Sequence, residues 1–170
     1  AKVDGLDEGA CYAYTLDGDA GRGGRFCTAR PSGDLLRFLA IGDTNPGLGD
    51  TTAKILEHVV PLGFDFTVHA GDIQYYASLL ETWSSWFPAM QPLLSAGAFM
   101  PAVGNHEDER PNEIEEYFTR FFSDGGTRYY RYQSAGVWFF ALDTEQPFGL
   151  ASPQGTWLAQ GLAEAERLLG

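Results

Sequence analysis

Three apolar stretches of this chain each end in a glycine followed by a side chain that carries oxygen. The pairs are Gly42-Asp43, Gly71-Asp72 and Gly104-Asn105. The residues before each glycine are typical of buried strands, and open α/β sheets place their chemistry at the carboxyl ends of such strands. We therefore expect Asp43, Asp72 and Asn105 to line one edge of a single sheet. Because carboxylate and amide oxygens are hard ligands, this edge is predicted to be a metal site.

Two further side chains extend this set of candidate residues. Tyr75 follows Asp72 by three positions, so both oxygens can face the same space where the chain leaves the strand. His106 follows Asn105 directly. An imidazole titrates near neutral pH, so His106 can donate a proton to a leaving oxygen or to a phosphoryl oxygen.

Each candidate also has a structural interpretation. An aspartate after a strand is most often a turn or helix-capping acid, and Tyr75 can be an aromatic that covers the following helix. Asn105-His106 can be a turn beside a surface histidine, and the acidic run at 107–109 is usually a solvated face. His58 is interpreted as structural, and His69 as a hydrogen-bonded core histidine rather than a metal ligand.

Alternating strands and helices are needed to position these residues. Hydrophobic spacing after residue 34 predicts an α/β order, in which strands and helices follow one another and the last two strands form a tight hairpin. The expected strands are 36–43, 66–68, 98–103, 128–133 and 137–142, and the expected helices are 50–62, 76–87, 113–122 and 154–169.

Length and charge limit the class of protein. A chain of 170 residues with 44% hydrophobic residues suits one globular catalytic or binding domain. Its formal net charge of -12 argues against a nucleic acid or an anionic membrane as a general partner. No apolar stretch approaches the roughly 20 residues that span a bilayer. Residues 1–4 do not begin a signal peptide, so any export signal is expected to lie outside this chain.

The first 33 residues differ in character from the rest. Cys11 and Cys27, the only two cysteines, lie on short aromatic-flanked runs that are separated by a turn rich in Gly and Asp. This pattern predicts a β-hairpin whose cysteines can face each other. A disulfide and two buried thiols are both compatible with it. The turn residues at 31–34 place the domain boundary, so we expect one unit at 1–33 and a second at 34–170.

The three blocks together resemble the calcineurin-like metallophosphoesterases. They read GD at 42–43, GDIQY at 71–75 and GNHE at 104–107, and the tyrosine in the second block is similar to that of the purple acid phosphatase branch. The resemblance implies that 34–170 is the amino-terminal half of a four-layer αββα sandwich, an incomplete catalytic domain. It also implies that 1–33 is a hairpin remnant of a fibronectin-like β-sandwich.

The same resemblance implies a metal-dependent phosphoric ester hydrolase with a dinuclear centre and a metal-bound hydroxide. Asp43 and Tyr75 would bind the first metal, Fe(III), and Asp72 would bridge both metals. Asn105 would bind the second, a divalent Fe, Zn or Mn, and His106 would be the catalytic residue that steadies phosphoryl oxygens or protonates the leaving group. A phosphate ester substrate and a secreted or extracytoplasmic location follow from the same likeness.

One departure from the family pattern matters. The family completes its metal shells with histidines from later blocks, whereas this chain has no histidine after His106. A missing segment or a second chain is therefore expected to supply those ligands. The alternative is a catalytically incomplete fragment, or a non-catalytic binding module that keeps the fold.

Overall fold

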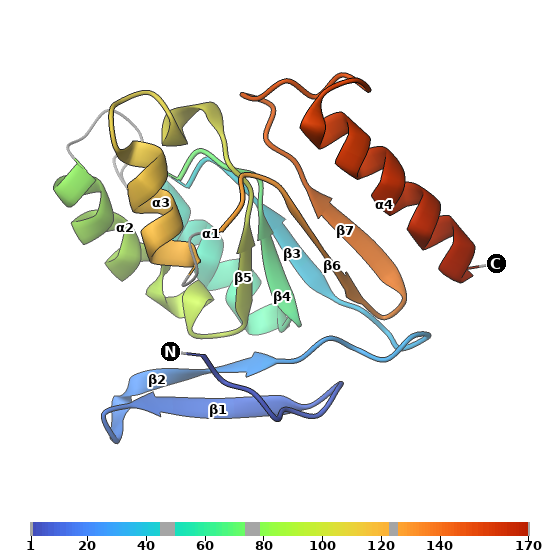
Figure 1. The fold of residues 1–170 in the computed structure, drawn as a ribbon. Helices are drawn as coiled ribbons and strands as arrows, with labels where there is room; N and C mark the ends of the chain where they lie inside the picture. The colour runs from blue at the N-terminus through green and yellow to red at the C-terminus, as the bar shows by residue number, and fades with distance from the viewer. Residues whose placement is uncertain (1, 45–49, 74–78, 123–125, 170) are drawn as a thin grey trace.

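The computed structural model describes residues 2–44, 50–73, 79–122 and 126–169 (Figure 1). Its centre is a parallel sheet of three strands in the order β3 (Phe38–Ile41), β4 (Phe66–His69) and β5 (Ala98–Pro101). Ile41 pairs in register with His69, and His69 with Pro101. The segments that leave the three strands therefore meet at one edge of the sheet, as the sequence predicts.

Helices cover one face of this sheet. They are α1 (Thr51–Val59), which continues as the 3-10 turn η2 (Val60–Leu62), then α2 (Leu79–Leu94) and α3 (Glu113–Phe121). Their apolar sides and the strand ends form the main core, whose fully or almost fully buried members are Leu56, Ile73, Trp83, Trp86, Met90, Leu93, Val103 and Tyr117.

Helix α2 differs from its prediction. Residues 76–78 of the predicted helix lie outside the described residues, and the helix runs seven residues beyond Phe87, through Pro88 and Pro92. A proline inside a helix removes a hydrogen bond and crowds the preceding turn. The helix continues because Met90 and Leu93 extend its buried face, so tertiary packing outweighs the local cost.

The opposite face of the sheet is covered by an antiparallel hairpin, β6 (Tyr130–Ser134) and β7 (Val137–Ala141). Tyr132 and Phe139 contact Phe66 of β4 edge to face, with ring centroids 5.5 and 5.2 Å apart. Phe140, on the other face of the hairpin, contacts Trp157 of α4 (Pro153–Leu169). Side chains of this hairpin thus alternate between the two layers that it separates.

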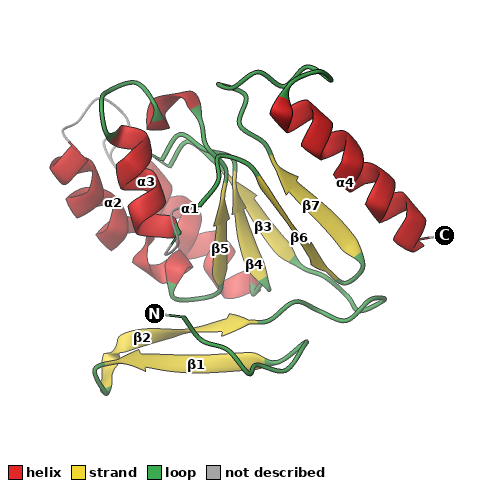
Figure 2. Ribbon diagram, viewed as in Figure 1, coloured by secondary structure: helices red, strands yellow, loops and turns green. Residues whose placement is uncertain are grey.

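These contacts give four layers in the order helix, sheet, hairpin and helix (Figure 2). The α/β prediction is confirmed, and so is the αββα order of layers. Within the described residues, no helix is both long enough and apolar enough to cross a membrane.

The first strands form the predicted hairpin, β1 (Cys11–Leu16) with β2 (Asp19–Cys27). Cys11 lies directly opposite Cys27, and the two are joined by a disulfide, which resolves the alternatives left open by the sequence. The hairpin contacts the body of the protein through Arg25, whose N–H donates to the carbonyl of Ser95. Its fibronectin-like origin and the boundary between 33 and 34 stay predictions.

Candidate metal centre

Two aspartates hold equivalent positions after adjacent strands. Asp43 follows β3 and Asp72 follows β4, and both have left-handed backbones, with φ of 53° and 58°. Asp tolerates this conformation better than most residues, but it still has an energetic cost. The N–H of Asp43 donates to the carbonyl of Gly71 at 3.2 Å, so the two turns are joined directly.

The turns after β4 and β5 approach so closely that only glycine fits between them. A Cβ on Gly104 would lie 2.2 Å from Oδ1 of Asp72 and 2.5 Å from its backbone nitrogen. A Cβ on Gly71, where φ is +92°, would lie 2.5 Å from the nitrogen of Gly104. Gly71 and Gly104 are therefore required by the contact between the segments that carry Asp72 and Asn105.

Glu107 holds this contact together. Its side chain is fully buried, and its two oxygens accept the N–H groups of Asp72, Ile73 and Gly104 at 2.9, 2.7 and 2.8 Å. Burial raises the pKa of this carboxyl, and the three N–H donors partly oppose that rise. The interpretation of Glu107 as part of a solvated acidic face is wrong.

A signal for Glu107 was present in the sequence. Glu107 lies three residues after Gly104. At this spacing an acidic side chain at the start of a helical turn can accept the backbone N–H of the residue just before the turn. That turn is η3 (Asn105–Glu107), a 3-10 helix that begins at the candidate ligand Asn105. One carboxylate therefore fixes both the Asp72 turn and the Asn105 turn.

His106 lies beside Asp72 in this arrangement. Its backbone N–H donates to Oδ1 of Asp72 at 3.2 Å, and the ring Nδ1 lies 3.0 Å from Oε1 of Glu109. The side chain is 11% exposed, so the imidazole lies at the surface of the site without projecting freely into solvent.

His69 is a core histidine, in agreement with the structural interpretation. It is fully buried, Nδ1 accepts the N–H of Gly71 at 3.2 Å, and Nε2 lies 2.8 Å from the hydroxyl of Thr44. Trp86 donates its indole N–H to the same hydroxyl at 2.9 Å. Burial lowers the pKa of His69 to about 4, an effect that Asp43 partly opposes. The neutral ring thus links the end of β4 to the start of the loop after Asp43.

A second buried acid near the site had no sequence signal. Asp143, which follows β7, is fully buried and forms an ion pair with Arg128. Arg128 also binds Asp108 at 2.6 Å, so it ties the segment after η3 to the end of β7. The two acids keep the pKa of Arg128 above its ordinary value, although burial opposes them. Asp108, too, is therefore a structural acid.

The donors described here suit a metal ion in kind. Asp43 and Asn105 are exposed and Asp72 is half-buried, so their oxygens lie at an open edge that an ion can reach. The remaining candidate, Tyr75, lies outside the described residues. In the described part of the chain, no group of three or more His, Cys, Asp and Glu side chains is arranged to hold a metal. The residues fit the oxygen ligands of a metal centre, and further donors would be needed to complete it.

Residues 36–163 match the family model of the calcineurin-like phosphoesterases. The chain belongs to this family. The match covers every element from β3 to most of α4, and so it includes all of the candidate ligands.

The chain is also similar in sequence to named purple acid phosphatases. Purple acid phosphatase 18 of Arabidopsis thaliana is 26% identical over 95% of the chain and 38% of its own length. Probable purple acid phosphatase 20 from the same plant is 28% identical over 81% of the chain and 34% of its own length. The chain is therefore similar to purple acid phosphatases, and it spans about a third to two fifths of their length.

The fold agrees with these sequence relationships. The solved structure of purple acid phosphatase PPD1 from yellow lupin seeds superposes with a TM-score of 0.76 at 18% identity, over 95% of this chain and 35% of that one. The amino-terminal half of a metallophosphoesterase sandwich is thus the architecture present here.

Proposed function

We propose that the chain is part of a metal-dependent phosphoric ester hydrolase of the purple acid phosphatase type. The observation that carries the proposal is the pair of left-handed aspartates, Asp43 and Asp72, at the carboxyl edge of the sheet, where the N–H of Asp43 donates to the carbonyl of Gly71, the residue before Asp72. Strained non-glycine residues gather at functional sites because surrounding contacts must hold them there. Family membership makes phosphate ester hydrolysis the chemistry that fits such a site.

In this proposal Asp43 and Tyr75 would hold one metal, Asn105 would hold a second, and Asp72 would be a ligand of both. The pair is proposed to be Fe(III) with a divalent Fe, Zn or Mn. When bound, two such ions supply positive charge to a phosphoryl group and activate a water. A missing segment or a second chain supplies the remaining histidine ligands.

The side chains of Glu107 and His106 have different proposed roles. Glu107 fixes the turns that carry Asp72 and Asn105, so both side chains keep their positions when the charge near them changes. His106, oriented by Glu109, holds the proton that it gives to a leaving oxygen or shares with a phosphoryl oxygen. The alternative is a binding module that keeps the fold without catalysis, and it would hydrolyse no phosphate ester.

A location outside the cytoplasm belongs to the same proposal. Its support is the disulfide between Cys11 and Cys27, since disulfides persist mainly in oxidising compartments. The net charge of -12 gives no support to a nucleic acid partner.

The test is metal binding followed by hydrolysis. We expect Asp72→Asn to weaken binding of Zn²⁺ and Mn²⁺ by more than about tenfold in calorimetry, because a charged ligand is lost. Asp4→Asn, an exposed aspartate far from the motifs in sequence, is the matched control and should change nothing.

Hydrolysis is measured on p-nitrophenyl phosphate, with the chain alone and joined to whatever sequence follows it in its gene. We expect metal-dependent activity in the joined form that Asp72→Asn and His106→Ala both abolish. Activity or metal affinity that neither substitution alters would refute the proposal. Metal binding with no hydrolysis in the joined form would favour the binding module.

A further inference from the structure

The buried ring of His69 joins two of the turns that carry candidate ligands. The N–H of Gly71 donates to Nδ1 at 3.2 Å, so this nitrogen carries a lone pair and the neutral ring has its proton on Nε2. Nε2 therefore donates to the hydroxyl oxygen of Thr44, 2.8 Å away. Thr44 directly follows Asp43, and Gly71 directly precedes Asp72. The ring thus spans the space between the two turns.

The hydroxyl of Thr44 is held from a second side as well. Trp86 of α2 donates its indole N–H to the same oxygen at 2.9 Å, so both lone pairs of that oxygen are engaged. Thr44 and Trp86 are both buried. A buried polar network whose members are all hydrogen-bonded favours one arrangement, because breaking any contact leaves a polar group without a partner. The network therefore fixes Thr44, and with it the adjacent Asp43, relative to β4 and α2.

The backbone of His69 extends these contacts to the third turn. Its carbonyl accepts the N–H of Ala102 at 2.7 Å, in the segment that leads from β5 to Asn105. The ring also packs against Phe99 of β5, with ring centroids 5.4 Å apart. His69 is therefore hydrogen-bonded to all three segments that carry candidate ligands.

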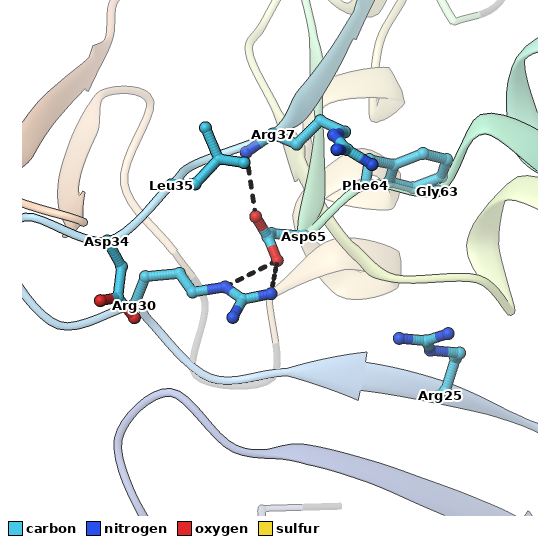
Figure 3. Close-up of a pocket in the computed structure, with 8 residues that line it drawn as sticks. All are labelled: Arg25, Arg30, Asp34, Leu35, Arg37, Gly63, Phe64 and Asp65. Carbon is cyan, nitrogen blue, oxygen red and sulfur yellow. Dashed lines mark hydrogen bonds and ion pairs between the residues drawn. The ribbon is translucent and has the colours of Figure 1, made fainter.

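The opposite ends of the same two strands are joined by Asp65. Its carboxylate accepts the backbone N–H of Arg37 and the guanidinium N–H groups of Arg30 (Figure 3). Arg37 precedes β3 and Asp65 precedes β4, so the pair of strands is held at its entry by Asp65 and at its exit by His69. Only the contacts at the exit lie next to the candidate ligands.

We propose that His69 and Thr44 are positioning residues of the candidate metal centre, and that the hydrogen bond between them sets the separation of Asp43 and Asp72. The inference rests on the proposed function, in which both aspartates bind the first metal. One ion reaches both carboxylates only if their turns are correctly spaced. His69 and Thr44 themselves bind no metal, because each acts through the turn beside it.

The test compares substitutions that differ by one hydroxyl group. Thr44→Val removes the acceptor shared by His69 and Trp86, and we expect it to weaken binding of Zn²⁺ and Mn²⁺ about tenfold in calorimetry. Thr44→Ser keeps the hydroxyl and should bind both ions as the unaltered chain does. Thr67→Val is the matched control, since this hydroxyl is also buried in β4 but has no hydrogen-bond partner among the described residues. Its metal affinity should not change.

A measurement without metal reports the turn directly. The amide of Asp43 donates to the carbonyl of Gly71, so its hydrogen exchange, followed by NMR, depends on the contact between the two turns. In Thr44→Val we expect this amide to exchange about tenfold faster, while amides in the middle of β4 keep their rates. Asp65→Asn weakens the opposite ends of the strands and should lower stability without changing the metal affinity of the folded chain.

The outcomes separate this inference from the proposed function. Equal metal affinity in Thr44→Val and Thr67→Val, or equal weakening in Thr44→Ser and Thr44→Val, would overturn the positioning role. Equal weakening in Asp65→Asn would overturn it too, because any loss of stability would then lower affinity. If Asp72→Asn still weakens binding in those cases, the proposed function stands. A chain that binds neither ion would overturn both.

Discussion

At the scale of single residues, the acids near the site divide into two kinds. Asp43 and Asp72 lie on left-handed turns at the edge of the sheet, whereas Glu107 and Asp143 are fully buried and satisfied by protein donors. Glu107 lies in the same motif as the candidate ligand Asn105, whereas Asp143 lies outside the three motifs. Their roles differ because burial makes Glu107 and Asp143 fixed acceptors within the protein, whereas Asp43 and Asp72 lie at the edge of the sheet.

His69 leads to a prediction about pH. Its pKa is about 4 in the folded protein and ordinarily near 6.5, so the folded state disfavours the proton that the unfolded chain accepts. The stability that depends on the neutral ring is complete above pH 6.5 and is lost as the pH falls toward 4. Over that range we expect the free energy of unfolding to fall by about 3 kcal/mol on account of this group.

Urea unfolding between pH 7 and pH 4 measures this loss. The variant His69→Gln should be less stable at pH 7 but should lose less stability on acidification than the unaltered protein. His58→Gln changes an exposed histidine and should reproduce the original slope. Parallel loss of stability in His69→Gln and the unaltered protein would show that another group titrates.

At the scale of elements, the site depends on how closely the turns after β4 and β5 approach. We expect Gly104→Ala to destabilise the protein by about 1–3 kcal/mol, because its Cβ would overlap the backbone and the carboxylate of Asp72. The same variant should bind Zn²⁺ more weakly than the unaltered protein. Urea unfolding and calorimetry measure the two effects.

Gly149→Ala is the matched control for this substitution. A Cβ at that position meets no atom within 4 Å, so we expect stability and metal affinity close to those of the unaltered chain. If both alanine variants behave alike, the close approach of the two turns is not what positions Asp72.

At the scale of the whole molecule, aromatic side chains join the sheet to the hairpin that covers it. Phe66 is 6% exposed, and it contacts Phe38 on the neighbouring strand and Tyr132 and Phe139 in the hairpin layer. Phe66→Ala should lower the free energy of unfolding by about 3–5 kcal/mol, since it leaves a cavity between layers. Urea unfolding followed by tryptophan fluorescence is the measurement.

Phe148→Ala provides the comparison for that substitution. Phe148 is 62% exposed, so its removal should change stability by less than about 0.5 kcal/mol. Similar losses in the two variants would mean that the contact between the layers contributes little to stability.

The sequence by itself determined the order of elements and the edge at which the candidate ligands lie. Apolar runs that end in glycine and an oxygen-bearing residue gave β3, β4 and β5, and parallel strands in sequential order bring Asp43, Asp72 and Asn105 to one edge. These features are local, because periodicity and strand ends are written into neighbouring residues.

Tertiary structure alone decided which polar residues are buried. Glu107 accepts N–H groups from a turn more than 30 residues away, and Arg128 joins Asp108 to Asp143. The extension of α2 through Pro88 and Pro92 and the pairing of Cys11 with Cys27 were also settled there. Each depends on the distance in space between groups far apart in the chain or on burial by other layers. The spacing of Glu107 from Gly104 indicates only the contact within its own turn, and no local pattern encodes those distances or that burial.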